Sequence, residues 1–142
     1  MSQPFAHRFR VRYSEVDPQA VVFNSRYLEY ADLVVTEWFR ALGIGFAGEQ
    51  PMEFHVARAV VDYRSPLRAD QQVEGRLRVV RLGNSSMTVG IALHLLDEHG
   101  SPASQPSAEI ELVQVHVDLD SGASQPLPDR LRARLAGETV HG

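Results

Sequence analysis

The sequence predicts an α+β domain in which one long helix packs on a five-stranded, mainly antiparallel sheet. Apolar residues recur at helical spacing over about four turns between Tyr27 and Leu42, and Trp38 and Phe39 on this helix are expected to pack in the core. One segment before the helix and four after it show the apolar and β-branched patterns of half-buried strands. The chain has 142 residues, the size of one domain, so we expect residues 1–142 to form a single unit.

Composition narrows the possible functions. Hydrophobic residues make up 44% of the chain, enough for a real core, and the net charge of -4 gives no reason to expect nucleic-acid or membrane binding. The chain has no cysteine and no lysine, since all fourteen basic residues are arginine. Disulfides, a cysteine nucleophile, thiolate metal sites, Schiff-base chemistry and a Walker lysine are therefore excluded. The N-terminus lacks an apolar signal core and no apolar run is long enough to span a bilayer, so a cytoplasmic location is expected.

The first strand and the long helix occupy the N-terminal third of the chain. Residues 8–13 alternate between arginine and apolar side chains, which predicts a strand that ends at Tyr13. Asn24 and Ser25 are candidate caps for the start of the helix. Gly43 suits the position just beyond its end, where glycine is favoured.

Alternating and β-branched segments predict the later strands, and clusters of glycine, proline and serine predict the connections between them. Two of these strands form a long hairpin, and a short helix follows the last strand. We expect strands at residues 54–64, 73–80, 87–95 and 110–117, loops at 44–53 and 97–107, a turn at 83–85, and a short helix with Asp129 as its N-cap.

Two positions within the strands predict irregular geometry. The apolar pattern shifts by one residue between Leu112 and Val113, which predicts a β-bulge, because a regular strand would turn its apolar side to water. Gly90 predicts either a bulge or the close approach of another stretch of backbone.

The loop before the long helix holds the strongest candidate for chemistry. Asp17 precedes a helix N-terminus, toward which free backbone N–H groups and the positive end of the helix dipole also point. A carboxylate beside free donors can activate water while the donors hold a developing oxyanion. The alternative is an ordinary capped turn, because aspartate before proline is common in turns. Glu15 lies two residues from Asp17, close enough for a shared site, but we expect it to be a surface charge of the loop or strand end.

Other kinds of site find less support in the sequence. The six histidines lack metal-ligand spacing, so no metal site is expected, and His55 and His94 are interpreted as structural or solvent-facing. A Gly-x-Ser-x-Gly elbow and a phosphate-binding glycine loop are both absent from the sequence. Arg64, Arg68 and Arg81 could contact phosphates, since guanidinium groups bind phosphate by two hydrogen bonds. The alternative for these arginines is ordinary solvated surface.

Residues 13–28 resemble the signature loop of a known family. Their pattern is Tyr13-x-Glu15-x-Asp17-x-x-x-Val21-Val22-Phe23-Asn24-x-x-Tyr27-Leu28. This pattern is similar to that of the 4-hydroxybenzoyl-CoA thioesterase family of hotdog-fold acyl-CoA thioesterases. The resemblance covers nearly the whole chain and includes Trp38, Gly43, Asp62-Tyr63-x-x-Pro66 with Asp70, Leu82-Gly83-x-x-Ser86, and the segment from Pro126 to Pro128.

This resemblance implies a hotdog fold, in which a curved antiparallel sheet wraps around the long helix, and dimers that hold active sites at their interface. It implies that Asp17 is the catalytic carboxylate, as general base or nucleophile, in a group that also contains Tyr13 and Asn24. Asn24 stands where one branch of the family has histidine, while in other branches the backbone N–H of this residue polarises the thioester carbonyl. Ala20 replaces a common glycine, and a positive φ there would make alanine costly. The expected substrate contacts are Ala20, Val21, Tyr27, Arg64, Arg68, Arg81 and Ser86.

The leading functional hypothesis is hydrolysis of an acyl-CoA or acyl-carrier-protein thioester by a homodimer or homotetramer. Coenzyme A would enter only as part of the substrate, and no metal or redox cofactor is expected. One rival is a non-catalytic module that binds an acyl thioester or a partner on the same fold. A weaker rival is a hotdog dehydratase, whose chemistry would require a well-placed histidine or second acid. The sequence places no histidine near Asp17.

Overall fold

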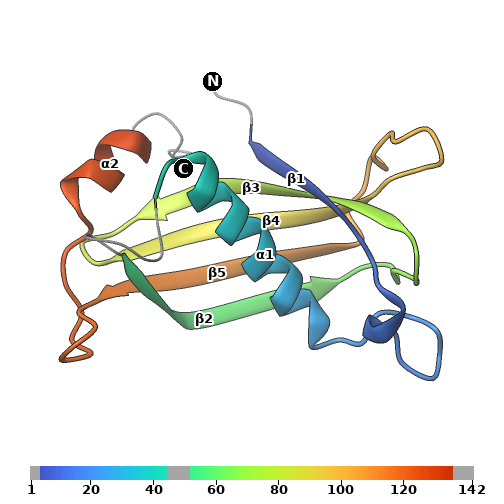
Figure 1. Ribbon diagram of the computed structural model, residues 1–142, viewed down its shortest axis with the longest axis horizontal. Helices are drawn as coiled ribbons and strands as arrows, with labels where there is room; N and C mark the ends of the chain where they lie inside the picture. The colour runs from blue at the N-terminus through green and yellow to red at the C-terminus, as the bar shows by residue number, and fades with distance from the viewer. Residues whose placement is uncertain (1–3, 45–51, 136–142) are drawn as a thin grey trace.

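One antiparallel sheet with the strand order β1-β3-β4-β5-β2 supports a long helix on one face (Figure 1). The computed structural model describes residues 4–44 and 52–135. The predicted α+β architecture is confirmed, and every strand pair in the sheet is antiparallel. The elements are β1 (Phe5–Arg10), a 3-10 turn η1 (Tyr13–Glu15), α1 (Arg26–Ala41), β2 (Glu53–Tyr63), β3 (Gln72–Leu82), β4 (Ser86–Leu95), β5 (Ala108–Val117) and α2 (Asp129–Leu135). Most of the predicted loop at 44–53 lies outside the described residues.

Helix α1 crosses the sheet and forms the centre of the core (Figure 1). Trp38 and Phe39 stack with ring centroids 5.3 Å apart and are both almost fully buried, as the sequence predicted. Burying a large apolar side chain stabilises a fold by about 1.5–3 kcal/mol, so this one face of the helix accounts for much of the core. The buried residues of α1 are Tyr27, Tyr30, Ala31, Val34, Val35, Trp38 and Phe39.

The two ends of α1 differ in how their backbone groups are satisfied. Gly43 has φ of +75° and donates its N–H to the carbonyl of Arg40, while Ile44 donates to the carbonyl of Phe39. This pair of bonds is a Schellman motif, and it confirms the predicted role of Gly43. At the other end Ser25 is the N-cap residue, but its side chain makes no capping hydrogen bond. The backbone donors at the start of α1 therefore lack the side-chain cap that the sequence suggested.

Gly75 sets how closely α1 approaches the sheet. This residue lies on β3 and is buried beneath the helix. A Cβ atom built at Gly75 would lie only 2.5 Å from Cγ2 of Val34. Any side chain at position 75 would therefore push α1 away from the sheet or distort β3.

The β-bulge predicted between Leu112 and Val113 is absent from strand β5. It pairs with β4 in unbroken register from Ser86↔Val115 to Leu93↔Ala108. Gln114 and His116 face inward and are buried, so the alternation continues with polar residues on the inner face. His116 is satisfied there, because its Nδ1 lies 3.0 Å from the carbonyl oxygen of Pro126.

The register shifts occur instead in β2, between Val56 and Arg58, and in β3, between Val79 and Arg81. Gly90 is in regular register, so its predicted bulge is wrong. The alternative prediction for Gly90, a close backbone approach, is also wrong, because the atoms nearest to a Cβ built there belong to side chains and the first of them, Cγ2 of Val80, lies at an ordinary contact distance of 3.4 Å.

Two predicted boundaries also require correction. Strand β1 ends at Arg10 rather than at Tyr13, because the chain turns where the Glu15 side chain accepts the Arg12 N–H at 2.7 Å. Asp129 is the first residue of α2 rather than its N-cap. The apolar side of α2 is as predicted, since Leu131 and Leu135 are both fully buried.

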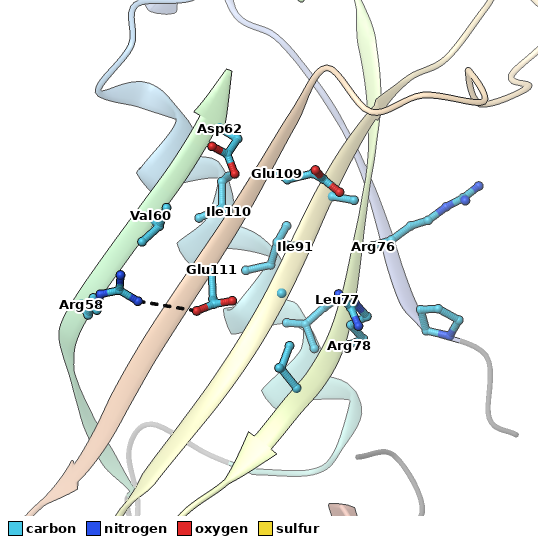
Figure 2. A pocket seen from close by; sticks show the side chains of 14 residues that line it. Arg58, Val60, Asp62, Arg76, Leu77, Arg78, Ile91, Glu109, Ile110 and Glu111 are labelled. Atoms are coloured by element: carbon cyan, nitrogen blue, oxygen red, sulfur yellow. Dashed lines mark ion pairs between the residues drawn. The ribbon is translucent and has the colours of Figure 1, made fainter. Parts of the chain in front are cut away.

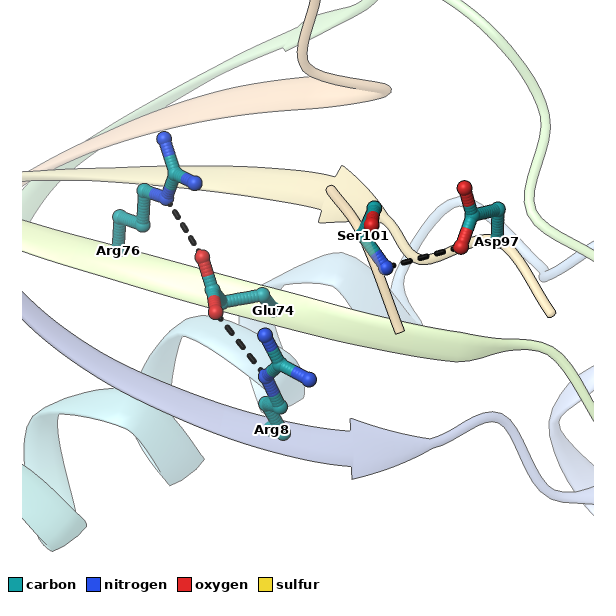
Figure 3. A network of polar contacts seen from close by, with 5 residues as sticks. All are labelled: Arg8, Glu74, Arg76, Asp97 and Ser101. Atoms are coloured by element: carbon teal, nitrogen blue, oxygen red, sulfur yellow. Dashed lines mark hydrogen bonds and ion pairs between the residues drawn. The ribbon is translucent and has the colours of Figure 1, made fainter. Parts of the chain in front are cut away.

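A charged group bridges β1 and β3 on the outer face of the sheet, away from α1 (Figure 3). The Glu74 carboxylate accepts hydrogen bonds from Arg8 Nε at 3.0 Å and from Arg76 Nε at 2.7 Å. Burial alone would raise the pKa of Glu74, but the hydrogen bonds and positive charges of Arg76 and Arg8 outweigh it and lower the pKa below its ordinary value. The Glu74 carboxylate is therefore ionised at neutral pH, and its ion pair with Arg8 links the edge strand β1 to β3.

We expect Gly75→Ala to destabilise the fold. The added methyl group would overlap Val34, and overpacking of this kind costs about 1–3 kcal/mol. The change should lower the free energy of unfolding measured by urea titration. Val34→Ala in the Gly75→Ala background should recover part of the loss.

Gly90→Ala is the matched control, because its nearest contact is 3.4 Å and lies on the opposite face of the sheet. Gly90→Ala should lower the free energy of unfolding by less than Gly75→Ala does. Equal effects of the two substitutions would contradict the role of Gly75 in setting the helix position.

Candidate active site

The loop between η1 and α1 forms a small hairpin that displays Asp17. Val16 and Val22 form an antiparallel bridge, and the Asp17 N–H donates to the Val21 carbonyl at 2.9 Å. The Ala20 N–H donates to the Asp17 carbonyl at 2.8 Å, and this hydrogen bond closes the turn. Asp17 Oδ1 accepts the Gln19 N–H at 2.8 Å, the Asx-turn geometry typical of aspartate. Asp17 itself is half-buried, and the described residues offer no partner for its Oδ2.

Ala20 occupies a strained backbone conformation at the tip of this hairpin. Its φ is +64°, in the left-handed region where a Cβ atom meets the following carbonyl oxygen. This geometry explains why glycine would suit the position. The chain tolerates alanine here because the two hydrogen bonds between Asp17 and residues 20 and 21 fix the turn.

Two backbone hydrogen bonds attach the hairpin to the rest of the molecule. The Val22 N–H donates to the Leu67 carbonyl at 2.8 Å, and the Phe23 N–H donates to the Glu15 carbonyl at 3.0 Å. Glu15 was expected to be a surface charge, and that prediction is wrong. Its side chain is half-buried and accepts hydrogen bonds from Arg12 and Tyr30.

The start of α1 lies directly after this hairpin and presents free donors. In the part of the chain that the structure describes, the backbone N–H groups of Asn24 and Ser25 have no hydrogen-bond partner, and both residues are exposed. Asn24 follows Val21 by three residues, a span of at most about 10 Å. The Tyr63 hydroxyl donates to the Asn24 carbonyl at 2.8 Å and fixes this turn against the end of β2. The positive end of the α1 dipole and two unpaired donors therefore lie close to the hairpin that holds Asp17.

Of the two tyrosines predicted at the site, one is exposed to solvent and the other is buried. Tyr13 is 85% exposed at the start of the loop, whereas Tyr27 is buried beneath it. The Tyr27 ring packs edge-on against Tyr63 with centroids 4.9 Å apart. Burial, the largest cause, raises the pKa of Tyr27, while a hydrogen bond with the Leu67 backbone lowers it. Tyr27 therefore supports the loop from below.

The predicted phosphate ligands do not converge on Asp17 within one chain. Arg68 follows Leu67, which binds the hairpin, so it lies beside the site. The Arg64 guanidinium is engaged by the Glu109 carboxylate, with Nε at 3.0 Å from Oε2. Arg81 and Ser86 flank the β3–β4 turn at the opposite end of the sheet. Arg81 is nine residues along β3 from its first residue, which corresponds to about 30 Å of extended strand.

Two surface hollows lie on different parts of the molecule. One, of about 470 Å³, lies on the outer face of the sheet between arginines and carboxylates, and none of the predicted site residues lines it (Figure 2). Figure 2 shows that Arg58 and Glu111 on its floor point toward each other, and they form an ion pair at 3.8 Å. The other hollow, of about 540 Å³, runs along residues 9–13 with Ala69 and Asp70, and so begins at Tyr13. Of these two hollows, the second adjoins the Asp17 loop.

Residues 4–44 and 52–135 contain no cluster of three or more histidine, aspartate or glutamate side chains able to hold a metal ion. His94 is buried with Nδ1 2.8 Å from the Ala103 carbonyl oxygen, and His55 is exposed, as expected for structural or solvent-facing residues. Over the same described ranges, no helix is both long and apolar enough to cross a membrane.

Comparison with known proteins identifies the family of this fold. A model of the thioesterase-like superfamily matches residues 11–135. The chain belongs to this superfamily. The match includes the Asp17 loop, α1 and every later strand.

Solved structures and one curated relative agree with this assignment. The PA5185 protein of Pseudomonas aeruginosa strain PAO1 is similar with a TM-score of 0.85 and 27% identity, over 99% of this chain and 94% of that one. A thioesterase of Thermus thermophilus, solved in complex with coenzyme A and zinc, is similar with a TM-score of 0.75 and 28% identity, over 94% and 98% of the two chains. An Aquifex aeolicus (strain VF5) protein named "Putative esterase" is 30% identical over 87 residues, which are 60% of this chain and 68% of that protein. The sheet and helix are therefore those of the thioesterase hotdog fold.

We expect Ala20→Gly to leave stability unchanged or to raise it by up to about 1 kcal/mol. Glycine adopts positive φ without steric cost, which offsets its larger loss of chain entropy on folding. Thermal unfolding of the purified variant measures the effect. The control is Ala133→Gly on the exposed side of α2, which should destabilise by about 1 kcal/mol because alanine favours helix there. A comparable loss in both variants would show that Ala20 is not strained in solution.

Proposed function

We propose that this protein hydrolyses an acyl thioester, with Asp17 as general base or nucleophile and the start of α1 as the oxyanion site. The observation that supports this most directly is the pair of unpaired backbone N–H groups, on Asn24 and Ser25, beside a loop that holds a half-buried carboxylate; within the described residues these two donors have no partner. Membership of the thioesterase-like superfamily supports the same reaction class.

In the general-base route, the Asp17 carboxylate takes a proton from water as the water oxygen attacks the thioester carbonyl carbon. The carbonyl oxygen becomes an oxyanion, which the N–H groups of Asn24 and Ser25 stabilise together with the α1 dipole. Collapse of the intermediate breaks the carbon–sulfur bond, and the departing thiolate takes the proton from Asp17. The products are a carboxylic acid and a free thiol. In the nucleophilic route, an Asp17 carboxylate oxygen attacks the carbonyl carbon, and the carbon–sulfur bond breaks as the thiolate leaves. Water then hydrolyses the resulting mixed anhydride, which gives the carboxylic acid, and the thiolate takes a proton from that water while the Asp17 carboxylate is regenerated.

Asp17 Oδ2 suits either role. Oδ1 is held by the Gln19 N–H, which fixes the orientation of the carboxylate, while the described residues leave Oδ2 free to face water or substrate. An oriented carboxylate with one free oxygen has the geometry that a general base requires.

Coenzyme A is the thiol that we propose for the substrate, with acyl-carrier protein as the alternative carrier. The support comes from the Thermus thermophilus thioesterase, which was solved with coenzyme A bound. Arg68 is the arginine best placed for a phosphate, because it is exposed beside the loop and its guanidinium makes no hydrogen bond or ion pair with the described residues. A closer relation to the 4-hydroxybenzoyl-CoA thioesterases is part of this proposal.

We also propose that a second copy of the chain completes the site. Strand β2 is an edge strand that pairs only with β5 among the described strands, and several large apolar side chains near it are exposed. Antiparallel pairing of two β2 strands would bring the far end of one sheet, with Arg81 and Ser86, toward the Asp17 loop of the other chain. The exposed apolar residues of β2 and of the start of α1 are Phe23, Leu28, Val56, Val60 and Tyr63.

A non-catalytic binding module is the rival function, and one observation favours it. The hydrogen bond from the Gln19 N–H to Asp17 Oδ1 is what an ordinary Asx turn would contain, without any catalytic role. A dehydratase is less well supported, because no histidine in the described part of the chain forms a hydrogen bond or ion pair with the Asp17 loop.

We expect Asp17→Asn to lower turnover by at least about 10²-fold, the lower range for loss of a general base. Asparagine has nearly the same size but carries no charge and accepts no proton. Release of free thiol from a panel of acyl-CoA substrates measures turnover, and melting temperature on the same sample measures folding. Binding of coenzyme A alone should survive.

The control is Asp32→Asn, which removes an exposed carboxylate of the same type from α1. It should leave thiol release unchanged. If Asp17→Asn also keeps full turnover, Asp17 has no part in the mechanism. If the unaltered protein releases no thiol from any substrate but binds acyl-CoA, the binding-module function replaces this proposal.

We expect an oligomer built on a dimer through β2. Val60→Asp places a charge on the edge strand β2 itself and should shift the protein toward monomer in sedimentation velocity at micromolar concentration. If the unaltered protein is itself a monomer under these conditions, the proposal that a second copy completes the site is contradicted.

A further inference from the structure

We propose that Glu15 is a positioning residue that sets the Asp17 hairpin relative to α1. The effect of Glu15 on catalysis rests on the proposed thioester hydrolysis. The contacts by which Glu15 holds the hairpin, here called the clamp, can be tested without any substrate.

One residue contacts both ends of the loop and the helix. The Glu15 Oε1 atom accepts the Arg12 N–H at 2.7 Å, at the point where β1 gives way to the loop. The same Oε1 accepts the Tyr30 hydroxyl at 3.0 Å, from the buried face of α1. The Glu15 backbone carbonyl accepts the Phe23 N–H at 3.0 Å, just before α1 begins. Glu15 therefore joins the start of the loop, its end and the helix, and it lies two residues away from Asp17.

Tyr30 provides a rigid anchor for this clamp. It is 3% exposed, and its ring packs against Phe9 of β1 with centroids 4.7 Å apart. Burial is the largest cause that raises the pKa of Tyr30, and the hydrogen bond to Glu15 raises it further. The hydroxyl therefore keeps its proton at neutral pH and well above it, and donates to Glu15 throughout.

The hairpin has few other contacts that could fix its position. Five residues of the segment are exposed, while Val22 is buried in the core and Val16 packs against the core. The Val22 N–H donates to the Leu67 carbonyl in the loop between β2 and β3, at the end of the hairpin nearer to α1. The start of the hairpin depends on Glu15, and a displacement of about 1 Å at a reacting group can cost about 10²-fold in rate. The exposed residues are Tyr13, Ser14, Pro18, Gln19 and Ala20.

Three substitutions separate positioning from other roles. Glu15→Ala removes both side-chain hydrogen bonds, Tyr30→Phe removes one and keeps the ring, and Glu15→Gln keeps an acceptor oxygen without the charge. We expect kcat for thiol release to fall by about 10-fold or more in Glu15→Ala, less in Tyr30→Phe, and least in Glu15→Gln, with smaller changes in KM. A residue that only stabilised the fold would lower the melting temperature without changing kcat per folded molecule.

Amide hydrogen exchange tests the clamp independently of activity. In Glu15→Ala and Tyr30→Phe, the amides of Asp17 and Val22 should exchange faster, while the core amides of β4 keep their protection. If Glu15→Ala does not fold, Tyr30→Phe still provides this measurement, because its ring packing is retained.

The outcomes distinguish this inference from the proposed function. Unchanged exchange and unchanged kcat in the folded variants would overturn the clamp. Equal losses of kcat in Glu15→Ala and Glu15→Gln, with normal amide exchange, would also overturn the clamp. They would indicate that the negative charge of Glu15, and not its hydrogen bonds, affects the reaction. If the unaltered protein hydrolyses no thioester, the proposed function fails, and faster exchange in the variants would still support the clamp.

Discussion

The close contact between Gly75 and Val34 sets how near α1 lies to the sheet. With no side chain at position 75, α1 lies directly on β3, and its apolar face reaches the inner residues of the sheet. The position of the helix fixes the position of its N-terminus. Because the Asp17 hairpin connects β1 to that N-terminus, the packing at Gly75 helps to set where the free N–H donors of Asn24 and Ser25 lie relative to the hairpin.

The hairpin itself combines local strain with a polar clamp. Ala20 holds a left-handed conformation, and the Asp17 side chain is fixed by the Gln19 N–H. Val16 and Val22 anchor the base of the hairpin on the core, and hydrogen bonds to Glu15 and Leu67 attach its two ends. The tip of the hairpin therefore stays exposed to solvent while the Asp17 carboxylate stays oriented. The hydrogen bonds to the Glu15 side chain also explain why a charged residue, and not an apolar one, occupies position 15.

Periodicity was enough to predict the sheet, the long helix and the short helix, because burial of one face imposes a regular pattern on the sequence. It failed at β5, where Gln114 and His116 face inward and His116 finds its partner in the carbonyl of Pro126. Glu15 was misinterpreted for a similar reason, since its partner Tyr30 becomes a neighbour only when α1 packs on the sheet. The loop motif led to Asp17 and Asn24, but no pattern in one chain could show that Arg81 and Ser86 lie at the far end of the sheet.

In the proposed function, the carbonyl of an acyl thioester binds between the Asp17 hairpin and the start of α1. Nuclear magnetic resonance titration of ¹⁵N-labelled protein with an S-(2-oxoalkyl) thioether of coenzyme A tests this placement, because the probe keeps a carbonyl group but cannot be hydrolysed. We expect the largest changes in chemical shift at the amides of Asp17, Asn24 and Ser25. Changes confined to the outer-face hollow around Arg58 and Glu111, with none at the start of α1, would contradict it.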